Sequence, residues 1–198
     1  MKEKNILSSL KGELYDLLQT VLISFFVISM MFTYGFRCTD VDGPSMEKTF
    51  FTGDKVLVIP LARNFKTGDI IVANAKKAHI YDANGNLTEN DGLNELIIKR
   101  VIAVEGQTLD IDFETGTVKV DGTALNEPYI TGLTHNDEGA FSGHYPLTIP
   151  EGYVFVMGDN RYISMDSRST KIGLVPASEI IGTVVLRVYP FDSFGKVS

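Results

Sequence analysis

Cysteine, tryptophan and paired histidines are scarce or missing in this chain of 198 residues, and these shortages exclude several kinds of protein. The single cysteine, Cys38, rules out an intramolecular disulfide. The three histidines, His79, His135 and His144, form no HExxH motif and no paired Cys/His spacing. We therefore expect neither a bound metal nor another cofactor.

Basic residues are outnumbered, with 18 Lys and Arg against 25 Asp and Glu and a formal net charge of −7. The charges of residues 1–16 cancel and residues 17–36 carry none, so the whole excess lies in residues 37–198. An acidic domain gains nothing from a phosphate backbone, so we expect no nucleic-acid partner. Contact with anionic lipid would have to be apolar.

Charge is absent from Leu17 to Phe36, a run long enough to cross a bilayer. At about 1.5 Å per residue, such a helix covers the roughly 30 Å hydrocarbon layer. A cleavable signal peptide has a shorter apolar region and small residues at the cut, unlike Phe36-Arg37-Cys38-Thr39. The run therefore predicts a permanent transmembrane anchor.

Lysine and arginine are distributed unevenly around the anchor. Lys2, Lys4 and Lys11 precede it, whereas only Arg37 follows closely. Positive residues stay on the cytoplasmic side. We therefore expect a cytoplasmic N-terminus (1–16), a transmembrane anchor (17–36), and a domain on the outer face of the cell membrane (37–198).

No long helical periodicity follows Phe36, and the apolar runs there are short, β-branched and separated by turn residues. They predict a mainly β domain, a folded sheet or barrel-like structure. Two stretches rich in turn residues, 81–94 and 128–150, predict surface loops or a small inserted subregion. The predicted strands are Lys55–Ile59, Ile70–Val72, Leu96–Val104, Val118–Val120, Tyr153–Met157 and Ile180–Val188.

Ser45 is a candidate nucleophile, in the turn sequence Asp42-Gly43-Pro44-Ser45-Met46. It follows Phe36 by nine residues, which reach at most about 30 Å, so it must lie near the membrane surface. A serine needs a base to remove its proton. Because Gly-Pro-Ser is common in loops, a purely structural turn is the alternative.

Lys99 is the candidate base, in the middle of an almost wholly apolar predicted strand. It shares a face with Ile97 and Val101, while Arg100 shares the other face with Ile98. Desolvation favours the neutral amine, which can act as a general base. The alternative is a lysine that reaches the strand edge or pairs with an acid.

Acids, arginines and hydroxyls are concentrated in Gly158 to Arg168, directly after a predicted strand. Composition alone favours a solvated loop over a supporting polar network. Together with the anchor, Ser45-Met46 and Lys99-Arg100, however, this segment resembles the bacterial type I signal peptidases, in their Gram-positive form. That family carries these elements in this order.

The resemblance implies a membrane-bound serine endopeptidase that removes signal peptides from secreted preproteins. Ser45 would attack the peptide carbonyl, and Lys99 would take its proton and pass it to the leaving amine. Ser164 would orient the lysine. Ion pairs that hold the site together would come from Arg100, Asp159, Asp166 and Arg168.

Three positions depart from the family pattern. Gly43 stands where some relatives have a serine that helps the oxyanion hole, so the hole would rely on backbone N–H groups, including that of Ser45. Lys48 replaces the usual proline, and Ile163 replaces a common asparagine. None of the three is a dyad position.

A signal peptide would bind as an added strand beside shallow apolar pockets. Asp42 and Gly43 belong to the candidate strand edge, and Ile71, Val72 and Ile97 are candidate pocket walls. The adjacent Phe50 and Phe51 would either dip into the lipid interface or pack in the core.

Other functions remain possible on the residues alone. A Ser-His-Asp triad is disfavoured because Lys99 has the better context. A LexA-like self-cleaving protein would lack the anchor and usually carry a DNA-binding part. A pilus-associated or other assembly factor could keep the fold with a specialised substrate, but the joint presence of Ser45, Lys99 and Ser164 argues against lost chemistry.

Overall fold

The structure is a computed structural model that describes residues 2–30, 35–60 and 64–197. Contacts along the backbone divide the chain into two units, Met1–Arg37 and Cys38–Ser198. Each unit has its own architecture.

The first unit contains one long helix, α1 (Lys2–Met30). Its stretch Lys11–Met30 is long and apolar enough to cross a membrane by length and composition. The helix begins well before the predicted span because residues 2–16 contain no proline and many good helix formers. Residues 31–34, which belong to the predicted span, lie outside the described residues.

The second unit is mainly β, as predicted. Its largest sheet is built from both halves of the chain, so the site residues of distant segments meet on it. In spatial order its strands are β1 (Arg37–Asp40), β2 (Lys55–Ile59), β13 (Ile180–Tyr189), β3 (Ile70–Asn74), β6 (Leu96–Val104), β11 (Tyr153–Met157) and β12 (Val175–Pro176), with β14 (Gly195–Lys196) paired to β13.

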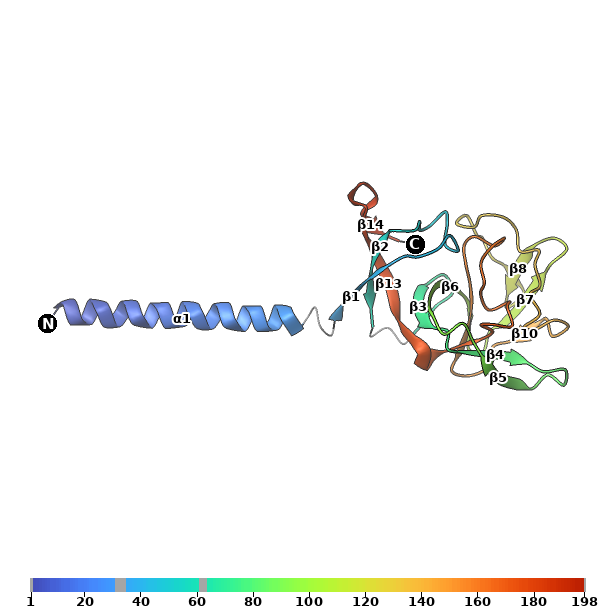
Figure 1. Cartoon of the computed structure of the whole chain (residues 1–198), viewed down its shortest axis with the longest axis horizontal. Helices are drawn as coiled ribbons and strands as arrows, with labels where there is room; N and C mark the ends of the chain where they lie inside the picture. Colours follow the sequence, from blue (N-terminus) through green and yellow to red (C-terminus); the bar gives the residue numbers. More distant parts are fainter. Residues whose placement is uncertain (1, 31–34, 61–63, 198) are drawn as a thin grey trace. The chain divides into compact units, whose positions relative to one another are not determined.

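Strand β13 bends the large sheet over. Its first half pairs antiparallel with β3 and its second half with β2 (Figure 1). The register shifts at several points along it. Such bulges kink and twist a strand. At the crossover, a Cβ on Gly182 would lie 2.4 Å from the carbonyl oxygen of Ile59, so only glycine fits there.

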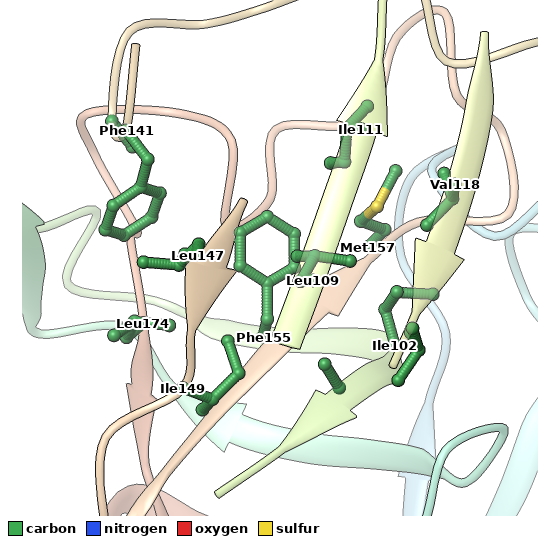
Figure 2. Close-up of a cluster of buried hydrophobic side chains, with 13 residues drawn as sticks. Ile102, Leu109, Ile111, Val118, Phe141, Leu147, Ile149, Phe155, Met157 and Leu174 are labelled. Carbon is green, nitrogen blue, oxygen red and sulfur yellow. The ribbon is translucent and has the colours of Figure 1, made fainter. Parts of the chain in front are cut away.

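A smaller, four-stranded sheet is also part of this unit. The smaller sheet has the order β10 (Leu147–Thr148), β7 (Thr108–Asp112), β8 (Thr117–Val120) and β9 (Thr123–Ala124). Side chains of β7 and β8 alternate between buried and partly exposed, as in a sheet with one solvated face. Figure 2 shows Phe155 of β11 amid the buried side chains that join this sheet to β6 and β11.

All six predicted strands are present. For 81–94, predicted as a surface loop or an inserted subregion, the loop alternative does not hold, because β4 (Lys77–Tyr81) and β5 (Leu87–Asp91) form an antiparallel hairpin that is a sheet of its own. Asp82 closes its turn by accepting hydrogen bonds from the backbone N–H groups of Asn84 and Asn86. Residues 128–150 are largely without regular structure, apart from β10. Past residue 36, the described helical segments are only η2 (Ala177–Glu179) and η3 (Phe191–Ser193).

Candidate active site

The segment that carries Ser45, residues 43–50, is a compact turn between β1 and β2. The N–H groups of Thr49 and Phe50 both donate to the carbonyl of Met46, at 2.9 and 2.7 Å. The side chains of Met46 and Phe50 are buried in a core cluster with Val56 of β2. The buried side chains of Met46 and Phe50 therefore fix the turn to the core, while Ser45 itself stays half-buried.

Lys99 projects from β6 and reaches Ser45. Its Nζ lies 2.7 Å from Ser45 Oγ, which is hydrogen-bonding distance. Lys99 is only 5% exposed, although it is a lysine. The structure thus brings the two candidate dyad residues into direct contact across 54 positions of sequence.

Burial changes the protonation of Lys99. Desolvation lowers its pKa from 10.5 to about 8, and the nearby carboxylates of Asp166 and Asp159 oppose this only in part. A substantial fraction of the amine is therefore neutral near pH 8 and available to accept a proton.

Arg100, whose side chain leaves β6 on the face opposite to Lys99, forms a buried ion pair with Asp159. The Arg100 Nε donates to Asp159 Oδ1 at 2.8 Å, and its second nitrogen donates to Oδ2 at 2.7 Å. Arg100 also donates to the carbonyl of Gly68 at 2.9 Å. This bidentate geometry compensates the desolvation of both charges.

Asp166 and Arg168 form a second buried pair. Arg168 donates to both carboxylate oxygens of Asp166, each at 2.9 Å, and the N–H of Gly158 adds a third bond at 3.0 Å. Burial by itself would raise the pKa of Asp166, but its hydrogen bonds and its attraction to Arg168 outweigh burial and hold that pKa below its usual value. Asp166 therefore stays charged.

Ser164 lies close to this network without a bond to the lysine. Its Oγ is buried and makes no well-aligned hydrogen bond with the described residues, but it lies close enough to the Asp166 carboxylate to help hold the pKa of Asp166 down. Its neighbour is Gly158, where an added Cβ would come within 2.1 Å of Ser164 Oγ and 2.5 Å of the Ser45 carbonyl oxygen. These three segments can approach so closely only because Gly158 has no side chain.

A cleft of about 270 Å³ opens beside Ser45 and Lys99. Three of the predicted substrate-binding residues, Asp42, Val72 and Ile97, line it, but Gly43 and Ile71 do not. Ile71, the partner of Lys99 across β3 and β6, is instead buried in a core cluster. The other residues lining the cleft include Leu93, Glu95, Leu96, Ile163 and Met165.

The structure also places the phenylalanines and histidines that the sequence analysis considered. Phe50 is fully buried, so for it the core alternative holds, while Phe51 is 53% exposed. The histidines lie outside the residues that line the cleft. Among the described residues, no group of three or more His, Cys, Asp or Glu could hold a metal ion.

Several site residues were not predicted. Thr49 Oγ1 donates to Asp159, and the Arg161 guanidinium, 1% exposed, pairs with Glu127. Tyr129 stacks on Arg100, with 3.9 Å from the guanidinium carbon to the ring centroid. Arg161 could have been found from its place in the 158–168 segment, but Glu127 and Tyr129 lie in an irregular stretch that offers no signal.

Comparison with known proteins identifies the family. A sequence model described as "Signal peptidase, peptidase S26" matches residues 14–189. The chain belongs to this family. It is therefore placed among the peptidases that act on signal peptides, which confirms the resemblance drawn from Ser45-Met46, Lys99-Arg100 and the 158–168 segment.

Curated relatives support the same family. The chain is 30% identical over 191 residues to signal peptidase I P of Bacillus subtilis subsp. natto, with 92% of each chain covered. It is 27% identical to signal peptidase I of Bacillus licheniformis, with 94% of each covered. It is also 27% identical to signal peptidase IB of Staphylococcus aureus (strain Mu50 / ATCC 700699), with 93% of this chain and 94% of the relative covered.

Among solved structures, a signal peptidase I from Enterococcus faecalis V583 superposes with a TM-score of 0.43 at 24% identity. The match covers 61% of this chain and 96% of that one.

Replacing Gly158 by alanine should disrupt the site without unfolding the domain. The new Cβ would push the Ser45 carbonyl or the Ser164 side chain aside, and displacing reacting groups by about 1 Å can cost on the order of 10²-fold in rate. Cleavage of a model preprotein measures the effect. Gly195→Ala is the matched control, because nothing lies within 4 Å of its added Cβ. Equal rates for the two variants would contradict the geometry.

Lys99→Met should stabilise the protein at neutral pH. The folded-state pKa of about 8 lies below the unfolded value of 10.5, so the cost of charging the buried lysine is fully present below pH 8 and disappears as pH rises toward 10.5. Methionine removes that cost, which is about 3 kcal/mol. Denaturant unfolding at pH 7 and at high pH measures the gain, with the exposed Lys171→Met as control. A gain that does not shrink at high pH would contradict this explanation.

Proposed function

We propose that this protein is a membrane-bound serine endopeptidase that removes N-terminal signal peptides from secreted preproteins by a Ser-Lys dyad. The observation that carries the proposal is the 2.7 Å contact between Ser45 Oγ and the Nζ of a buried lysine whose pKa is lowered to about 8. Family membership supports the substrate class. The named relatives are all signal peptidases, which does not favour an assembly factor.

The chemistry begins with neutral Lys99, which takes the proton of Ser45 as Oγ attacks the scissile carbonyl carbon. The carbonyl oxygen becomes an oxyanion. The backbone N–H of Ser45 forms no hydrogen bond with the rest of the described protein, so it is free to donate to that oxyanion. Lys99 then passes its proton to the leaving amine, and the C–N bond breaks.

The acyl group is now an ester on Ser45. Lys99, neutral again, removes a proton from water, whose oxygen attacks the ester carbonyl. The bond between the acyl carbon and Ser45 Oγ breaks, and Oγ recovers the proton from Lys99. The signal peptide leaves with a new carboxylate. The same base thus serves both halves of the reaction.

The ion pairs Arg100–Asp159 and Asp166–Arg168 act as supports rather than reacting groups. The two carboxylates whose charges act on Lys99, those of Asp159 and Asp166, each have a guanidinium partner, so less negative charge remains to hold the lysine protonated. Ser164 is proposed to orient the lysine on the resemblance alone, and this would need its Oγ to turn toward Nζ.

The substrate is proposed to bind as an extended strand along the edge that contains Asp42. Val72 and Ile97 would form apolar walls of the cleft, and Ile163 and Met165 would add to them from the opposite segment. A cleft of this size beside the nucleophile suits small side chains, such as those expected one and three residues before the cut.

Ser45→Ala and Lys99→Ala should each abolish cleavage of a model preprotein, with the exposed Ser178→Ala as control. The rate of the wild type on a soluble peptide should rise with pH around a midpoint near 8, because only neutral Lys99 can act as base. Full activity of both dyad variants, or a rate that falls through that range, would show that the assignment is wrong.

The apolar stretch of α1 is proposed to anchor the protein in the cell membrane as a single span. Residues 1–16 would lie in the cytoplasm, 17–36 would span the bilayer, and 37–198 would form the domain on the outer face. Protease added outside cells stripped of their wall should digest the large domain and spare a tag at the N-terminus. The reverse pattern would invert the topology.

A further inference from the structure

Residues 127–134, named the clamp segment here, run between the turn that carries Ser45 and the segment that carries Asp159. The N–H of Thr131 donates to the Asp159 carbonyl at 2.8 Å, and the N–H of Arg161 donates to the Thr131 carbonyl at 3.1 Å. Thr131 Oγ1 also donates to the carbonyl of Glu47 at 3.3 Å. The clamp segment therefore fixes the turn that carries Ser45 and the segment that carries Asp159 relative to each other.

Lys48 ties the serine turn to the same segment. Its Nζ donates to the Pro128 carbonyl at 2.6 Å. Its φ is +66°, in the left-handed region, which proline cannot adopt because its ring fixes φ near −65°. The departure from the family's usual proline thus has a local structural reason: this turn has a backbone conformation that proline would forbid.

Tyr129 covers the buried ion pair from the clamp segment. Its ring lies over the Arg100 guanidinium at 3.9 Å, and its hydroxyl donates to Glu127 at 3.2 Å. Glu127 in turn pairs with the buried Arg161. The hydrogen bond to Glu127 holds the hydroxyl end of the ring. The ring keeps water from the Arg100 guanidinium, and the lower local dielectric strengthens the ion pair between Arg100 and Asp159.

Arg100 connects this cover to both halves of the dyad. Its partner Asp159 accepts a hydrogen bond from Thr49 in the serine turn, and Arg100 itself contacts Thr49 Oγ1 at 3.4 Å. Asp159 also acts on Lys99 through its charge. A displaced guanidinium would loosen the serine turn and leave the carboxylate uncompensated beside the lysine.

We propose that Tyr129 is a positioning residue for the Ser45–Lys99 dyad: its ring keeps the Arg100 guanidinium on Asp159, and this fixes the serine turn and neutralises the charge that faces the lysine. The inference rests on the proposed function and adds a residue to it. Tyr129 is not among the residues that line the cleft, so we expect its effect in kcat rather than in KM.

The charged groups around Lys99 set the expected direction of the effect. Asp159 and Asp166 face it from the 158–168 segment, and Asp42 and Glu95 line the cleft beside it. Only Asp159 depends on Arg100 for its compensation, because Asp166 has Arg168. Losing the cover should therefore favour protonated Lys99 and move the acidic limb of the pH–rate profile to higher pH.

Tyr129→Phe and Tyr129→Ala in the full-length protein test the proposal. Phenylalanine keeps the stacked ring, so it should retain activity within about threefold, whereas alanine should lower kcat by about tenfold or more with little change in KM. Alanine should also shift the acidic limb upward by about half a unit or more. Tyr189→Ala, an exposed tyrosine at the end of β13, is the matched control.

Three results would overturn the proposal. One is an unchanged kcat and pH profile in Tyr129→Ala. Another is a lower melting temperature with normal kcat and pH profile, since that marks a merely structural role. The third is an equal defect in Tyr129→Phe, which would assign the effect to the hydroxyl and Glu127.

Ser45→Ala in the same assay separates this inference from the proposed function. If Ser45→Ala is inactive while Tyr129→Ala behaves as wild type, only the role of Tyr129 fails. If Ser45→Ala stays active, the dyad itself is wrong. The pKa of Lys99, followed by NMR of labelled lysine side chains in both Tyr129 variants, then still tests the link from Tyr129 to the lysine without reference to catalysis.

Discussion

Desolvation of Lys99 is the constraint on which the rest of the site depends. An ammonium group in an apolar sheet is costly, and that cost is what lowers the pKa of the lysine to about 8. An uncompensated carboxylate nearby would stabilise the ammonium group and raise the pKa of the lysine again. Both neighbouring aspartates therefore carry a bidentate arginine, so the surroundings of the lysine are polar yet close to neutral.

The two residues of the proposed dyad are held in different ways. Lys99 is fixed by β6, which pairs with β3 on one side and β11 on the other. Ser45 lies on a turn and depends on contacts from outside it: Asn160 donates to its carbonyl at 3.0 Å, and the clamp segment and Asp159 bind the residues that follow. A rigid base and a turn secured by several segments together explain a 2.7 Å contact between residues far apart in sequence.

Local pattern in the sequence was enough for much of the fold. The bounds of β2, β6 and β11 match the predicted runs because these strands are buried and β-branched, where period and composition agree. The hairpin of β4 and β5 has no clear sequence pattern, because β5 is polar and mostly exposed and the five residues of β4 do not alternate between apolar and polar. Ile71 was predicted as a pocket wall but lies buried beside Lys99, its partner across β3 and β6, and does not line the cleft. A strand that is buried on both faces gives no pattern from which the sequence could show which of its residues reach a cleft.

The site divides in the same way. The sequence by itself determined the candidate groups: a serine in a turn sequence, a lysine in an apolar predicted strand, and a dense set of aspartates and arginines after another predicted strand. Only the tertiary structure decided which carboxylate pairs with which guanidinium, that Ser164 makes no bond to Lys99, and that Tyr129 and Glu127 belong to the site at all. The physical reason is that a pKa and a hydrogen bond depend on burial and distance, and these are set by segments that meet in space from distant parts of the chain.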